Sequence, residues 1–133
     1  MTRWLTTFGA VVAFVFFVGC ESSDDSPSDG IITDLDELAR LFCEQEKECY
    51  PEWFYDDYET VQDCIDAGYA REEIGSVVEH YEEHGTAACH QSSLEYFNCL
   101  VQLSCSELYE WAEGVGSDYP CWEEGDTMNR LCD

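Results

Sequence analysis

Apolar residues recur three and four positions apart along most of the chain after residue 32, and this is the spacing of one face of an α-helix. Thr33 is a suitable N-cap for the first such stretch, and Pro51 disfavours helical geometry in the residue before it. We therefore expect a first helix from Thr33 to about Cys49. A second helix is expected to begin near Asp57 and to end at Gly68.

The same spacing continues to the C-terminus. A third apolar stripe ends before Gly85, which is a suitable C-cap, and a fourth runs from about Thr86 to Cys105. Ser106 is a suitable N-cap for a short fifth helix, and Pro120 suits the start of a last one. Strand-like alternation is absent over any useful length. The pattern therefore predicts an all-α fold of five to six short helices.

The first twenty residues form a separate segment. A short start that carries one positive charge, Arg3, precedes a mostly apolar run from Leu5 to Val18. This run is long enough for the apolar region of a signal peptide and short for a membrane span. It ends in Phe17-Val18-Gly19-Cys20, which resembles the lipobox of bacterial lipoproteins.

The resemblance implies that residues 1–19 are a lipoprotein signal peptide and that Cys20, acylated with chains such as palmitate, becomes the new N-terminus. Phe17 departs from the family, which prefers Leu, Val or Ile there. An ordinary signal peptide or a short N-terminal anchor is the alternative. In the family, Asp after the acylated Cys favours the inner membrane. Glu21 therefore favours the outer membrane, with the periplasmic or surface face left open.

A hydrophilic segment separates this signal from the helical pattern. Residues 21–30 are dominated by Ser, Asp, Pro and Gly, and they cannot bury enough apolar surface to fold. We expect residues 20–32 to be an acidic flexible tether and residues 33–133 to be one cysteine-rich helical domain.

Nine cysteines in 133 residues are typical of exported proteins in oxidising compartments. If Cys20 carries lipid, the even number that remains predicts four disulfides. No C-x2-C pair is present, which argues against the usual zinc-ribbon and thioredoxin-type sites. The predicted disulfide cysteines are Cys43, Cys49, Cys64, Cys89, Cys99, Cys105, Cys121 and Cys132.

The cysteine spacing repeats along the chain. Cys43-x5-Cys49-x14-Cys64 is matched by Cys99-x5-Cys105-x15-Cys121, and one more cysteine follows each set. Chance is the alternative explanation, but the matched gaps favour a duplicated helical pair. Because positions six apart on a helix point about 120° away from each other, Cys43 and Cys49 should reach different partners. The repeat then predicts a nested pairing: Cys43–Cys89, Cys49–Cys64, Cys99–Cys132 and Cys105–Cys121.

The chain has 30 Asp or Glu against 5 Lys or Arg, which gives a net charge of −25. This balance excludes nucleic acid as a partner, because phosphate contacts need clustered basic residues. The acidity has two interpretations, a surface that stays soluble in high salt and an acidic face for a cationic partner. The even spread of the acids along the chain favours the first.

The string His80-Tyr81-Glu82-Glu83-His84 matches the H-x-x-E-H pattern of inverted zinc peptidases, in which two His bind zinc and the Glu is the general base. Catalytic domains of that family are much larger than this chain. Looser binding of a metal ion by His80, Glu83 and His84 is less demanding. We expect no catalytic residue, no cofactor and no dedicated metal site, and these three residues are only weak candidates.

Residues 50–58 combine five aromatic side chains with a proline and several acids. Such a cluster could bind a basic or sugar ligand through stacking and cation–π contact. Core packing of Trp53, Phe54 and Tyr58 is the alternative that we favour, since a small domain needs its large side chains inside.

Together these patterns predict a membrane-anchored, disulfide-stabilised binding or structural module of the bacterial cell envelope without catalytic activity. Its expected partners are the membrane, through the lipid anchor, and an envelope protein or a sugar. The alternative is a metal-binding protein or zinc hydrolase that uses residues 80–84.

Overall fold

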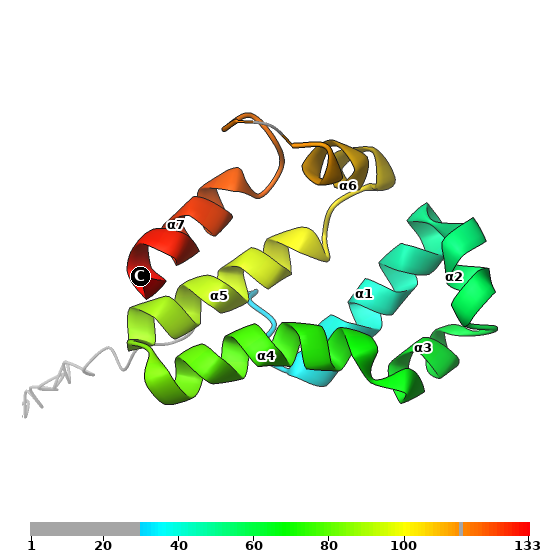
Figure 1. Ribbon diagram of the computed structural model, residues 1–133, viewed down its shortest axis with the longest axis horizontal. Coiled ribbons are helices and arrows are strands. Elements are labelled where there is room, and N and C mark those ends of the chain that lie inside the picture. The colour runs from blue at the N-terminus through cyan, green and yellow to red at the C-terminus, as the bar shows by residue number, and fades with distance from the viewer. Residues whose placement is uncertain (1–29, 115) are drawn as a thin grey trace, which may run out of the picture.

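The computed structural model describes residues 30–114 and 116–133 (Figure 1). The predicted signal peptide, Cys20 and most of the predicted tether lie outside these residues. Within them the fold is all-helical, as predicted, and no strand is present. The helices are α1 (Leu35–Cys49), α2 (Pro51–Asp57), α3 (Val61–Ala67), α4 (Tyr69–His84), α5 (Ala87–Leu100), α6 (Cys105–Ala112) and α7 (Trp122–Cys132).

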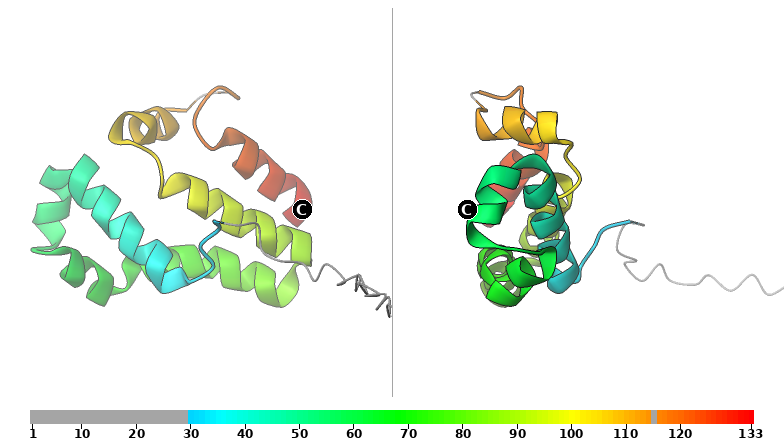
Figure 2. Two further views of the ribbon diagram at one scale, coloured as in Figure 1. Left: turned by 180° about the vertical axis from the view of Figure 1, so that it is seen from behind. Right: turned by 90° about the vertical axis from the view of Figure 1, so that its right-hand side faces the viewer.

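Helices α1, α4 and α5 form the centre of the molecule, and α7 packs along α5 (Figures 1 and 2). Helices α2 and α3 form the end of the molecule that lies farthest from the C-terminus (Figure 1). The central helices enclose the main apolar cluster, because their inward stripes repeat every three or four residues. Its buried members are Leu38, Ile74, Val78, Leu94 and Val101.

A second apolar cluster joins α1 to the end formed by α2 and α3. It contains Ala39, Cys43, Phe54, Cys64 and Ala70, and Phe42 packs against both clusters. Helix α1 therefore contributes buried residues to both clusters.

Capping side chains set the helix boundaries, and two of the capping residues differ from those predicted. Asp34, rather than Thr33, caps α1 by accepting hydrogen bonds from the N–H groups of residues 36 and 37. Ser104, rather than Ser106, caps α6 and forms a reciprocal capping box with Glu107. The helix predicted from Thr86 to Cys105 ends earlier, at Leu100, because Ser104 is extended and the predicted fifth helix, α6, begins at Cys105.

All eight predicted cysteines are paired in the structure, but the predicted nested pairing is wrong at every bond. Cys43–Cys89, Cys49–Cys64, Cys99–Cys132 and Cys105–Cys121 are replaced by Cys43–Cys64, Cys49–Cys105, Cys89–Cys132 and Cys99–Cys121.

Helix packing explains the observed pairs. Cys43 faces the neighbouring α3, whereas Cys49 lies at the end of α1 and meets the first residue of α6. Helices α5 and α7 are antiparallel, so the start of each helix meets the end of the other and a disulfide joins them at both ends. Cys43 and Cys49 do reach different partners, as their helical spacing predicts.

The packed domain includes Ile31 and Ile32, which lie before its predicted start at residue 33. The buried Asn98 of α5 holds this segment through both ends of its amide. Its Oδ1 accepts from the Ile32 N–H at 2.8 Å, and its Nδ2 donates to the Ile32 carbonyl at 2.8 Å and to the Leu94 carbonyl at 2.9 Å. The chain is thereby fixed against α5 before α1 begins.

None of the helices in the described ranges combines the length and the apolar character needed to cross a membrane. Four disulfides within about a hundred residues are typical of oxidising compartments outside the cytosol.

Candidate functional site

The aromatic segment 50–58 forms α2, a helix that the sequence analysis did not predict. Pro51 occupies the first helical position, where its missing N–H group costs no hydrogen bond. Adjacent residues of a helix point about 100° apart, and this separates the neighbouring rings of Trp53 and Phe54. Phe54 is 3% exposed in the second apolar cluster, whereas Trp53 is 78% exposed. Core packing, the favoured interpretation, is therefore right for Phe54 and wrong for Trp53, and the half-buried Tyr58 packs against the same cluster as Phe54.

A pocket of about 210 Å³ lies beside α2, and we call it the aromatic pocket. Its walls come from the C-terminal half of α1, from α2 and the residues flanking it, and from the first residue of α4. The lining residues are Glu46, Tyr50, Trp53, Phe54, Asp57, Tyr58 and Tyr69. Aromatic rings and carboxylates thus share one concave surface.

A second hollow of about 270 Å³ adjoins the aromatic pocket, and Tyr50 and Trp53 line both. Tyr109 of α6 forms the opposite wall of this hollow. Its ring meets the Tyr50 ring edge-on at a centroid distance of 5.1 Å. Trp53 therefore stands where the two hollows meet.

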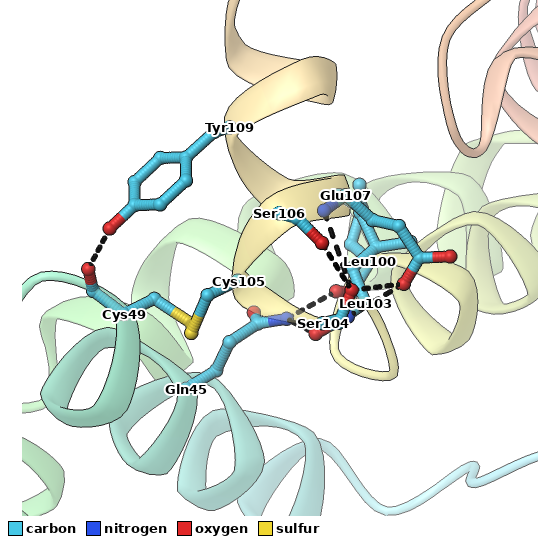
Figure 3. Close-up of a disulfide and its surroundings, with 9 residues drawn as sticks. All are labelled: Gln45, Cys49, Leu100, Leu103, Ser104, Cys105, Ser106, Glu107 and Tyr109. Carbon is cyan, nitrogen blue, oxygen red and sulfur yellow. Dashed lines mark hydrogen bonds between the residues drawn. A yellow bond between two sulfur atoms is a disulfide. The ribbon is translucent and has the colours of Figure 1, made fainter.

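The junction between α1 and α6 holds Tyr109 in place (Figure 3). The Cys49–Cys105 disulfide joins the two helices, and the Tyr109 hydroxyl donates a hydrogen bond to the Cys49 carbonyl. The buried Gln45 Nε2 donates to the Leu100 and Leu103 carbonyls, each at 2.9 Å. This junction fixes α6 beside the α2 end of the molecule.

The aromatic pocket is strongly negative. Burial raises the pKa of Glu46, and the nearby carboxylates of Glu73 and Asp57 raise it further. Burial also raises the pKa of Tyr58, with added repulsion from Asp57 and Glu46. The carboxylates of Glu46, Asp57 and Glu73 thus repel one another where water is partly excluded, and charges interact more strongly there than in bulk water.

The basic side chains of the described residues are engaged away from the aromatic pocket. Arg40 pairs with its helix neighbours Glu37 and Glu44, and Arg71 pairs with Asp36 and Glu79.

The two remaining basic side chains also have partners elsewhere. Arg130 pairs with Asp126 on α7, and the Lys47 ammonium lies 5.9 Å from the centroid of the Tyr55 ring. Across residues 30–114 and 116–133, no ion pair neutralises Glu46, Asp57 or Glu73.

The weak metal candidates lie at the exposed C-terminal end of α4. The ring centroids of His80 and His84 are 5.1 Å apart, and the His84 Nε2 lies 3.6 Å from a Glu83 carboxylate oxygen. In the part of the chain that the structure describes, just one group brings three potential metal ligands within 4.8 Å of one another. It consists of Cys99, Cys121 and Glu124, and its two sulfurs are bonded to each other. His80, Glu83 and His84 therefore do not converge as a three-ligand site.

The aromatic pocket was only partly visible in the sequence. The cluster at 50–58 marks the segment, but Glu46 and Tyr69 come from other helices, as does Tyr109 of the adjoining hollow, and no motif connects them with the segment. In the apolar pattern of α1, Glu46 occupies a polar position, and nothing in the pattern indicates that its side chain lines a pocket.

No family model matches the sequence, and neither a curated protein nor a solved structure matches the chain.

Proposed function

We propose that this protein is a binding module of the bacterial cell envelope and that the aromatic pocket is its binding site. One observation carries the proposal: Trp53 is 78% exposed at the edge of a preformed pocket, whereas the neighbouring Phe54 of the same helix is buried. Exposed aromatic side chains beside a pocket are typical of surfaces that bind partners, because they give large contact area for little loss of conformational freedom.

The fold supports this role. The disulfides Cys43–Cys64 and Cys49–Cys105 join α1 to α3 and α6, and two apolar clusters pack the lining helices together, so little conformational entropy is lost when a ligand binds. The lining residues Glu46, Asp57 and Tyr69 have no hydrogen-bond partner for their side chains within residues 30–114 and 116–133. Their polar atoms are therefore free to contact a ligand.

A photo-crosslinking amino acid at position 53 tests the binding site in full-length protein on intact membranes. We expect a crosslinked product of defined mass from position 53. The matched control is position 55 on the same helix, where Tyr55 is exposed but lines neither hollow. Equal products from both positions, or none from position 53, would contradict the proposed site.

We also propose that the module is held at the membrane by lipid on Cys20 and that a tether follows it. The basis is the likeness of residues 17–20 to the lipobox and the hydrophilic composition of residues 21–30. Replacing Cys20→Ser should move the protein from the membrane fraction to the soluble fraction. Retention of the Cys20→Ser protein in the membrane would instead indicate an uncleaved anchor.

A further inference from the structure

We propose that the aromatic pocket binds an organic cation, namely the ammonium or guanidinium group of a basic side chain on a partner protein. This inference rests on the proposed function and adds the chemistry of the ligand. The composition of the pocket, the spacing of its acids and the lack of an ion-paired basic side chain beside them in the described part of the chain support this assignment.

Aromatic faces and carboxylates together suit an organic cation. A cation over an aromatic face is attracted by the ring quadrupole, most strongly over Trp. The pocket offers Trp53 together with the tyrosines Tyr50, Tyr58 and Tyr69. A cleft lined by one sign of charge also concentrates the field inside it and so raises the local concentration of the opposite charge.

The repulsion among the acids distinguishes a cation from a neutral sugar. Glu46 is repelled by Glu73 and Asp57 while it is partly removed from water. A neutral ligand that entered the pocket would remove still more water and leave this repulsion in place. A positive group would relieve it, so the charge of the site favours a cation.

The spacing of the acids distinguishes an organic cation from a bare metal ion. A calcium ion is held by six to eight oxygen ligands at about 2.3–2.6 Å. Glu46, Asp57 and Glu73 do not form a group whose ligand atoms lie within 4.8 Å of one another in the described part of the chain. A guanidinium group, with five N–H donors on a planar fork, can satisfy carboxylates that are too far apart to hold one metal ion.

The basic side chains of residues 30–114 and 116–133 leave the site open. Arg40, Arg71 and Arg130 are held by carboxylates on their own helices or on α1, and Lys47 lies over Tyr55. The lining residues Trp53 and Tyr69 are 78% and 66% exposed, so a side chain on another protein can reach the site.

Titration of the full-length protein in detergent with a labelled lysine- and arginine-containing peptide tests this inference. The control peptide carries acetyl-lysine and citrulline at the same positions. We expect binding of the cationic peptide alone. Tetramethylammonium and spermidine serve as free organic cations, and both should bind more weakly than the peptide. Tighter binding of a free cation would overturn the assignment to a partner protein.

Matched variants separate the aromatic pocket from the general acidity of the chain. Trp53→Ala and Tyr69→Ala should each weaken peptide binding roughly fivefold or more, whereas Tyr55→Ala should change it by less than about twofold. Glu46→Gln should weaken binding more than Glu82→Gln, which removes the same charge from the exposed surface of α4.

Several outcomes would overturn the inference. Equal losses in Glu46→Gln and Glu82→Gln would mean that overall charge alone attracts the peptide. Equal binding of the neutral peptide would exclude a cation site. If no cation binds while position 53 still crosslinks to an envelope component, the cation assignment fails and the proposed function stands. If neither occurs, both fail.

Discussion

Glu46 differs from the other perturbed carboxylates of the described residues. Hydrogen bonds from Arg40 lower the pKa of Glu37, and hydrogen bonds from Ser104 lower the pKa of Glu107. Glu46 has no such partner, and burial with repulsion from Glu73 and Asp57 raises its pKa instead. At the scale of single residues, the carboxylate of the aromatic pocket therefore opposes folding when it is charged.

This pKa shift predicts a pH-dependent effect of Glu46→Gln. A raised pKa in the folded state means that the folded protein holds this proton more tightly than the unfolded chain does, so Glu46 favours folding at low pH. That contribution is lost as the pH rises from the ordinary Glu range through the folded pKa. Urea unfolding should thus show Glu46→Gln gaining stability over the wild type as the pH rises towards 7.

The control for this prediction is Glu82→Gln, which removes one negative charge from an exposed position. Its stability relative to the wild type should change less over the same pH range. An advantage of Glu46→Gln that is equally large below the ordinary Glu range would show that repulsion and burial of this carboxylate are not its cause.

Asn98 is the second residue whose role a single substitution can test. Asn98→Ala removes three hydrogen bonds and leaves the Ile32 N–H and two carbonyls without their partner. We expect a loss of about 1–3 kcal/mol in the free energy of unfolding. Asn98→Asp should not restore the stability, because a carboxylate cannot donate to the Ile32 and Leu94 carbonyls. Full stability of Asn98→Asp in chemical denaturation would contradict this role.

At the scale of helices, polar side chains define the ends that apolar spacing leaves undefined. The stripes of α1 and α4 predict their helices well, since these helices pack one face against the core. The break between α5 and α6 follows from Ser104 and Glu107, which form the S-x-x-E pattern of a capping box. This signal is present in the sequence, and apolar spacing alone does not detect it.

The candidate site was less predictable than the helices. Sequence marks the aromatic residues near Trp53, but periodicity over a seven-residue helix cannot tell which ring is exposed. Tyr69 and Tyr109 reach the site through packing between helices that are distant in the sequence. Long-range packing, rather than local propensity, therefore builds the site.

Gln45 links α1 to the turn between α5 and α6, and its loss should loosen that turn. Gln45→Ala leaves the Leu103 carbonyl without its Gln45 donor, and the Leu100 carbonyl keeps only the Leu103 N–H at 3.3 Å. The expected cost is about 1–3 kcal/mol in the free energy of unfolding. Gln45→Met, which keeps the volume and lacks the donor, should lose a similar amount. If Gln45→Met is as stable as the wild type, packing rather than hydrogen bonding explains the role of Gln45.

At the scale of the whole molecule, the disulfides follow the order of the cysteines in the two matched sets. Within each set the first cysteine bonds the third, and between the sets the second bonds the second and the fourth bonds the fourth. The elements of the two sets differ, since Cys43 and Cys49 share α1 whereas α5 ends between Cys99 and Cys105. The cysteine spacing revealed the two matched sets but not the disulfide partners, because partner choice depends on how the helices pack.

Two of these bonds lie at opposite ends of the molecule and should have separable effects. Cys49–Cys105 fixes α6 beside the aromatic pocket, and Cys89–Cys132 joins α5 to the end of α7 (Figure 1). Their sequence separations, 56 and 43 residues, are similar. Because the stabilisation from a disulfide grows only slowly with loop length, each double Cys→Ser variant should lose about 3–4 kcal/mol of stability.

Function should distinguish the two variants where stability does not. Loss of Cys49–Cys105 frees α6, so Tyr109 no longer holds its place beside Tyr50 and Trp53, and crosslinking from position 53 should fall. Loss of Cys89–Cys132 should leave crosslinking unchanged at a temperature where both variants remain folded by circular dichroism. An equal fall in both variants would show that the site depends on the stability of the whole domain rather than on the junction of α1 with α6.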